Sequence, residues 1–138
     1  MNENYEIIIE NDISEITTLS EKVEELAELM NLNPTVVFNI QLALEELLSN
    51  TISYGYDDDG KHDILITFGL NNEILNITIE DNAREFNPLL KADPDITTPL
   101  EERQIGGLGI YFVKQFMDDI NYQRVDNKNI IKISKKIN

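Results

Sequence analysis

Residues 34–54 read PTVVFNIQLALEELLSNTISY, a run rich in apolar side chains that predicts a long helix at the centre of the core. Asn33 precedes the run and Pro34 opens it, and these are favoured cap and first-turn residues of an α-helix. At about 100° per residue, one side of this helix carries the side chains expected in the core: Val37, Ile40, Leu44, Leu47, Leu48 and Thr51. Phe38 and Leu42 form a second, narrower stripe, which either packs internally or belongs to a dimer seam.

Glu46 and Asn50 fall in the gap between the two stripes, one turn apart, so their side chains project on the same side of the helix. A carboxylate and an amide oxygen held side by side can position a hydroxyl and ligate a hard cation. The alternative is that both residues belong to the solvated strip of an amphipathic helix. The helix by itself favours the solvated strip.

The size and composition of the chain predict one domain over residues 1–138, because 41% hydrophobic residues suffice for a core. No segment approaches the roughly 18 consecutive apolar residues of a membrane span, and no leader of basic and then apolar residues opens the chain. The absence of cysteine excludes disulfides and fits a reducing compartment. We therefore expect a cytoplasmic protein that does not associate with membranes.

The net charge of −15 argues against nucleic acid as a partner, because the long-range field repels phosphate backbones. The same field attracts a basic protein. A polyphosphate ligand would need local compensation from a metal ion, a helix N-terminus or a few well-placed cations.

The rest of the chain alternates strand and helix patterns. Asp12 with Glu15 resembles a capping box, and the helix behind it has an apolar stripe of Ile16, Leu19, Val23, Leu26 and Met30. Strands are predicted at 5–9, at 64–70 and 74–80 around an Asn71-Asn72 turn, and at 120–125 and 130–137 around residues 126–129. A third helix is predicted over residues 107–117. Together these predict an α+β two-layer sandwich, in which a mixed, mostly antiparallel sheet is covered on one face by about three helices.

A second polar cluster, DNAREF, begins at Asp81 and directly follows the strand 74–80. A carboxylate at a strand end can accept a hydrogen bond from an exocyclic amine such as that of adenine, and the small Ala83 leaves room for a flat ring. The alternative is an Asx turn, in which Asp81 bonds only its own backbone. The local sequence by itself favours the Asx turn.

The third cluster is Gly106-Gly107-Leu108-Gly109, which opens the predicted third helix. Glycines let several backbone N–H groups approach an anion, and the helix behind them adds the positive end of its dipole. The cluster is not a Walker loop, because no Gly-Lys-Ser/Thr follows it. It is also not a Rossmann motif, because no parallel βαβ unit surrounds it.

In this order the clusters resemble the Bergerat-type ATP-binding fold shared by DNA gyrase, heat-shock chaperones, histidine kinases and mismatch-repair ATPases. That superfamily has a Glu-x-x-x-Asn helix, here Glu46 to Asn50, and then an Asp turn after a strand, here 81–86. A mobile lid follows, here about 87–105 with three of the four prolines, and then a glycine-rich helix start. The closest likeness is to bacterial anti-sigma factor serine/threonine kinases, which carry an acidic pair before the Asn, here EELLSN.

The resemblance implies a role for the polar residues of the helix. Glu46 would be the general base, and Asn50 would ligate the Mg²⁺ that bridges the triphosphate of ATP. Arg84 and Arg103, chosen by charge and proximity, would neutralise phosphate charge. The phosphates would be cradled by the backbone around Gly106, Gly107, Leu108 and Gly109.

The resemblance also implies an adenine site. Asp81 would read the adenine amino group, with Ala83 beside the ring and Phe86 among the nucleotide-binding residues. The family usually has a glycine where this chain has Ala83. Alanine fits there unless that backbone needs φ > 0.

Two function classes follow from the resemblance. In the first, the chain is an anti-sigma factor that transfers the γ-phosphate of ATP to a serine or threonine of an antagonist protein. In the second, it is a nucleotide-controlled binding module that captures a sigma factor without catalysis. The presence of Glu46 favours the kinase.

Overall fold

The computed structural model describes residues 2–90 and 107–137. The elements in chain order are β1 (Asn2–Glu10), α1 (Glu15–Leu29), α2 (Pro34–Tyr54), β2 (Asp63–Asn71), β3 (Ile74–Asp81), the 3₁₀ turn η1 (Pro88–Leu90), α3 (Gly107–Phe116), β4 (Asp119–Val125) and β5 (Lys128–Lys136). Arg103, Gly106 and most of the predicted lid lie outside the described residues.

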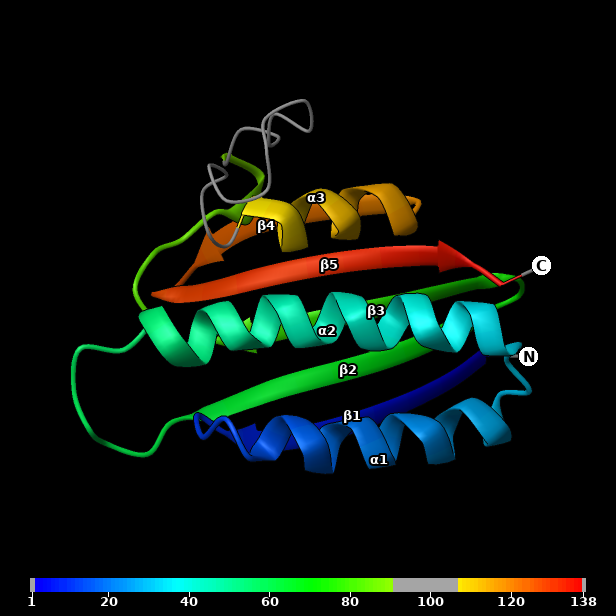
Figure 1. Ribbon diagram of the computed structural model, residues 1–138, viewed down its shortest axis with the longest axis horizontal. Coiled ribbons are helices and arrows are strands. Elements are labelled where there is room, and N and C mark those ends of the chain that lie inside the picture. Colours follow the sequence, from blue (N-terminus) through cyan, green and yellow to red (C-terminus); the bar gives the residue numbers. More distant parts are fainter. Residues whose placement is uncertain (1, 91–106, 138) are drawn as a thin grey trace.

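The five strands form one sheet in the order β1-β2-β3-β5-β4, and each of the four pairings is antiparallel. The three α-helices lie along one face of this sheet, with α2 between α1 and α3 (Figure 1). The predicted two-layer α+β sandwich is confirmed. The sheet is more regular than the mixed sheet we expected, because no described strand pairs in parallel.

The core lies between the helices and the sheet, and α2 supplies much of it. Five of the six residues predicted on its core stripe are buried: Ile40, Leu44, Leu47, Leu48 and Thr51. The sixth prediction is wrong by one position, because Val36 is buried while Val37 is only half-buried. Phe38, from the second stripe, is 63% exposed and therefore does not belong to the core.

The predicted capping box of α1 is wrong in detail. Ser14 is the N-cap residue and makes no side-chain cap bond; instead Asp12 Oδ1 accepts from the Ser14 backbone N–H at 3.0 Å and from its hydroxyl at 2.9 Å. The Glu15 carboxylate accepts from the Glu10 N–H at 3.1 Å, so it ties α1 to the end of β1. No described helix combines the length and the apolar character needed to cross a membrane.

The hairpin between β4 and β5 is tighter than predicted. Asp126 and Asn127 both have positive φ, 50° and 62°, as the two-residue turns that suit the twist of a hairpin require. The predicted four-residue loop therefore shrinks to two residues, and Lys128 and Asn129 join β5. This places Asn129 opposite Asp81 in the β3–β5 register.

The turn between β2 and β3 also differs from the prediction. It falls at Asn72-Glu73, one residue later than predicted, with Asn72 at φ 58°.

Candidate functional site

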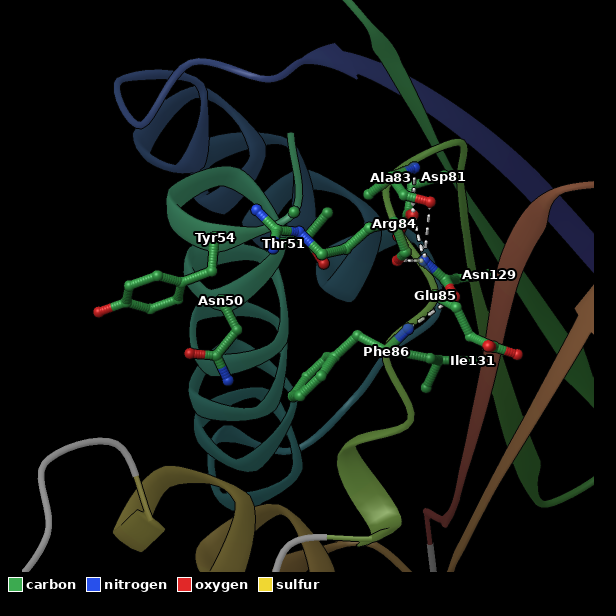
Figure 2. A pocket seen from close by; sticks show the side chains of 11 residues that line it. Asn50, Thr51, Tyr54, Asp81, Ala83, Arg84, Glu85, Phe86, Asn129 and Ile131 are labelled. Atoms are coloured by element: carbon green, nitrogen blue, oxygen red, sulfur yellow. Dashed lines mark hydrogen bonds between the residues drawn. The ribbon is translucent and has the colours of Figure 1, made fainter. Parts of the chain in front are cut away.

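A cavity of about 280 Å³ opens between the C-terminal half of α2, the segment after β3, and β5. Figure 2 shows the side chains that line it. Asn50, Thr51 and Tyr54 come from α2; Asp81, Ala83, Arg84, Glu85 and Phe86 come from the end of β3 and the loop after it; Asn129 and Ile131 come from β5. Asn50 of the first predicted polar cluster thus meets the second cluster at one cavity.

Asp81, the last residue of β3, is 3% exposed and lines the cavity. Its Oδ1 accepts from the Ala83 N–H at 3.0 Å and from Asn129 Nδ2 at 2.9 Å. The Asx turn and the cavity therefore occur together, so the two interpretations of Asp81 were not exclusive. Among the described residues, Oδ2 accepts no hydrogen bond, which leaves that oxygen for a ligand.

The pKa of the Asp81 carboxyl is raised, because burial penalises the charged form more than its partners favour it. The hydrogen bonds from Asn129 and Ala83 lower the pKa, as does the charge of Arg124, and these only partly offset burial. The same carboxylate and, above all, burial raise the pKa of Tyr56 well above its usual value. Burying the charged Asp81 carboxylate therefore lowers the free energy of unfolding, and its hydrogen bonds offset this only in part.

Ala83 is buried, and its backbone is not among those with positive φ. An L side chain is therefore unstrained at this position, which answers the question raised by the missing glycine. The residue it faces is Gly55 at the end of α2: a Cβ built on Gly55 would lie 2.8 Å from the Ala83 Cβ. The Arg84 N–H also donates to the Gly55 carbonyl at 2.8 Å. The loop after β3 is consequently docked directly on the end of α2.

Phe86 and Arg84 of this loop make different contacts. Figure 2 shows the Phe86 ring extending from the loop toward α2, and its side chain lines the cavity. Arg84 Nη2 instead makes an exposed ion pair with Asp57 Oδ1 at 2.7 Å. Arg84 is thus engaged with the α2–β2 connection, and the structure gives no support to its expected role at phosphates.

Glu46 and Asn50 are both half-buried, and Asn50 Nδ2 donates to Glu46 Oε1 at 3.3 Å. The Glu46 carboxyl lies against α3, where a Cβ built on Gly109 would overlap it. Position 109 therefore accommodates Glu46 in this arrangement because glycine has no side chain. Glu46, Asn50 and the start of α3 meet at this point, although Glu46 itself does not line the cavity.

No group of three or more His, Asp and Glu side chains that could hold a metal ion occurs within residues 2–90 and 107–137. Asn50 offers one amide oxygen, since its nitrogen is committed to Glu46. A hard cation at Asn50 would accordingly take most of its oxygen ligands from a bound polyphosphate and water. This donor set fits a cation that arrives with a nucleotide.

Asn129 is a site residue that the sequence analysis missed. It is 3% exposed and lies opposite Asp81 on the neighbouring strand. Besides donating to Asp81, its Nδ2 donates to the Arg84 carbonyl at 2.8 Å, and its Oδ1 accepts from the Tyr122 hydroxyl at 2.6 Å and from the Phe86 N–H at 3.3 Å. The only local signal for a role of Asn129 was its position directly beside a predicted strand, because asparagine is depleted in strands.

Comparison with known proteins shows the family of the chain. Residues 9–135 match the histidine kinase-like ATPase domain. The anti-sigma F factor of Clostridium perfringens (strain 13 / Type A) is 28% identical over 120 residues, which cover 85% of this chain and 86% of that protein. The serine-protein kinase RsbW of Bacillus cereus (strain Q1) is 31% identical over 97 residues, 67% of this chain and 60% of that protein.

Two solved structures share the fold. The RsbU and RsbW domains of a Mycobacterium tuberculosis protein superpose with a TM-score of 0.69 at 12% identity, over 98% of this chain and 32% of that chain. A histidine kinase domain from Erythrobacter litoralis superposes with a TM-score of 0.56, also at 12% identity, over 91% of this chain and 60% of that chain. Because the sequence match spans nearly all of the chain, this protein belongs to the histidine kinase-like ATPase domain family.

Proposed function

We propose that this protein binds ATP in the cavity beside Asp81 and transfers the γ-phosphate to a serine or threonine of an antagonist protein, as an anti-sigma factor. The observation that carries the proposal is the continuity of the site along α2. Asn50 lines the cavity that ends at Asp81, and it is hydrogen-bonded to Glu46, which contacts the start of α3. One helix thereby links the cavity at Asp81 to the start of α3.

The adenine ring would occupy the cavity. Asp81 Oδ2 is the oxygen without a described partner, and it would accept a hydrogen bond from the exocyclic amine. The cavity wall is largely apolar on either side of this acceptor, with Phe86 on the loop and Ile131 on β5. An apolar slot with one buried acceptor is the usual form of a site for a flat, polar-edged ligand.

The triphosphate would extend toward the N-terminus of α3, which begins at Gly107. Backbone N–H groups at the start of a helix are free to bind anions, and the helix dipole adds favourable charge. This compensation matters in a chain with a net charge of −15. Mg²⁺ arriving with ATP would be ligated by Asn50 Oδ1 and would neutralise further phosphate charge.

Glu46 would act as the general base. The hydroxyl oxygen of the protein substrate attacks the γ-phosphorus while its proton passes to a Glu46 oxygen. The bond between the γ-phosphorus and the β–γ bridging oxygen breaks, and ADP leaves. The hydrogen bond from Asn50 and the contact with α3 orient the Glu46 carboxylate for this step.

The protein partners proposed are a sigma factor and its anti-sigma-factor antagonist. The names of the relatives support these two partner classes, since both anti-sigma F factors and a serine-protein kinase are similar to this chain. The competing proposal is a binding module that holds ATP without using it. The contact of Glu46 with Asn50 and α3 favours the kinase, because a pure binder has no need of a positioned base.

The proposal is tested in two steps. ATP with Mg²⁺ should raise the melting temperature of the protein, and no shift would refute the nucleotide site itself. Glu46→Gln should then lower phosphorylation of an anti-sigma-factor antagonist by about 10²–10⁴-fold, the usual contribution of a general base. Glu45→Gln, an exposed neighbour on the same helix, is the matched control and should keep the parent rate. Equal rates in parent and Glu46→Gln, with ATP bound, would favour the binding module.

A further inference from the structure

The orientation of the Asn129 amide is fixed by its neighbours. Its Nδ2 faces the Arg84 carbonyl and, at 3.5 Å, the Ala83 carbonyl, and both of these can only accept. Its Oδ1 faces the Phe86 N–H, which can only donate. A flipped amide would lose all of these bonds, so the nitrogen must point at Asp81.

This orientation decides which oxygen of Asp81 is available. Oδ1 already accepts from the Ala83 N–H and from Asn129, which uses both of its lone pairs. Asn129 can only donate at this contact, so it favours the ionised form of Asp81. The remaining oxygen, Oδ2, then faces a ligand as an acceptor without a proton.

Purine bases differ in what they offer to such an acceptor. Adenine carries a 6-amino group, which donates, whereas hypoxanthine and guanine carry a 6-oxo group, which accepts. A buried carboxylate oxygen opposite a 6-oxo group would leave two acceptors facing each other without a hydrogen. Rejection of the 6-oxo bases therefore depends on keeping Asp81 without a proton on Oδ2.

We propose that Asn129 is a specificity-determining positioning residue, which makes the site select 6-amino over 6-oxo purine nucleotides by holding Asp81 as a pure acceptor. This inference rests on the proposed ATP site and adds to it a residue from another strand. Asn129 acts through Asp81 and through the loop that it anchors at Arg84 and Phe86. The Tyr122 hydroxyl donates a hydrogen bond to Asn129 Oδ1. Burial, together with the charge of Glu85, raises the pKa of the Tyr122 phenol, so the hydroxyl keeps its proton and remains a donor.

The variant Asn129→Asp separates specificity from simple anchoring. The introduced carboxylate keeps the oxygen that accepts from Phe86 and Tyr122 but removes the donor that faces Asp81. Two carboxyl groups at hydrogen-bonding distance retain a shared proton, because they resist ionising together. A proton on Asp81 converts its free oxygen from an acceptor into a donor, which suits a 6-oxo group.

The experiment measures the affinities of ATP and ITP with Mg²⁺ by calorimetry in the parent, Asn129→Asp and Asn121→Asp. Asn121 is exposed on β4, so its variant makes the same change of charge away from the cavity. We expect the parent to prefer ATP by about 10–100-fold, the value of a hydrogen bond to a charged group. Asn129→Asp should lower this ATP-to-ITP ratio by about tenfold or more, and Asn121→Asp should keep it.

The outcomes distinguish the inference from the proposed function. No binding of ATP by the parent refutes the proposed function, whereas equal binding of ATP and ITP by the parent refutes the inference alone. An unchanged ratio in a folded Asn129→Asp also refutes it, even if both affinities fall, because lost anchoring weakens both ligands alike. If Asn129→Asp does not fold, Asn129→Ala decides: a lower ratio than the parent supports the inference, and the parental ratio overturns it.

Discussion

The two ends of the proposed site are built very differently. At the adenine end, Asp81 and Asn129 are each 3% exposed, and hydrogen bonds between 2.6 and 3.3 Å join β3, β4, β5 and the loop after β3 around them. At the phosphate end, Glu46 and Asn50 are half-buried and share one bond of 3.3 Å. The first end is organised before a ligand binds. The second has polar groups close together, and the nucleotide would supply their remaining partners.

The strongest test of this contrast is the removal of one residue from each end. Asp81→Ala should lower the affinity for both ATP and adenosine by about 100-fold, because the amine loses a buried charged acceptor. Asn50→Ala should lower the affinity for ATP with Mg²⁺ by about tenfold and leave adenosine unaffected. Calorimetry with both ligands measures this. Asn82→Ala, an exposed neighbour of Asp81, is the control. If the Asp81 and Asn50 variants lost adenosine affinity equally, the site would not be divided into an adenine end and a phosphate end.

The contact between Glu46 and Gly109 predicts an energetic coupling across the phosphate end. Alanine is the better helix former by about 1 kcal/mol, but in the parent a methyl at 109 would overlap the Glu46 carboxyl. We expect Gly109→Ala to be neutral or destabilising in the parent and stabilising in the Glu46→Ala background. Chemical denaturation of the four proteins in this cycle measures a coupling of about 1–2 kcal/mol. Additive effects would show that Glu46 does not rest on Gly109 in solution.

The sequence predicted that Glu46 and Asn50 are neighbours but missed Asn129, and the reason is physical. Glu46, Asn50 and Gly109 lie on helices, where a fixed periodicity converts spacing into direction, and Glu46 and Asn50 were placed together from i and i+4 alone. Asn129 acts through a partner 48 positions away, which only the strand register reveals. That register depended on a two-residue turn, and the loop predicted over 126–129 hid it.

Other misses have the same origin. Val36 is buried in place of Val37, and a projection of the helix alone contains no information about the elements that pack against it. The polar contacts of Asp12 and Glu15 were assigned to each other, although Glu15 bonds the end of β1. Periodic elements were predictable from local sequence, whereas contacts between elements required the fold.

The raised pKa of Asp81 predicts that the adenine end costs stability. A carboxyl whose pKa is raised on folding binds protons more readily in the folded state, so its contribution favours folding at low pH. That contribution is lost as the pH rises through the raised pKa. Asp81→Asn removes the buried charge and should raise the melting temperature of the nucleotide-free protein by a few degrees at pH 7. Thermal unfolding between pH 4 and pH 7 should show the gain growing with pH. A constant or shrinking gain would argue that Asp81 is not strained by burial.

The smallest effect concerns Arg84, which lies beside the cavity but contacts neither Asp81 nor Asn50 through its guanidinium. Its ion pair with Asp57 is exposed on both sides, and such pairs contribute less than about 0.5–1 kcal/mol. Arg84→Gln should therefore lower stability only slightly, and less so at high salt. The affinity for ATP should stay within about threefold of the parent, because a long-range charge is screened at ordinary ionic strength. If Arg84→Gln lost more than this in affinity for ATP but lost no affinity for adenosine, Arg84 would have to leave Asp57 and bind phosphate. The phosphate end would then recruit its charge from the loop of the adenine end, and the two regions would form one unit once ATP is bound.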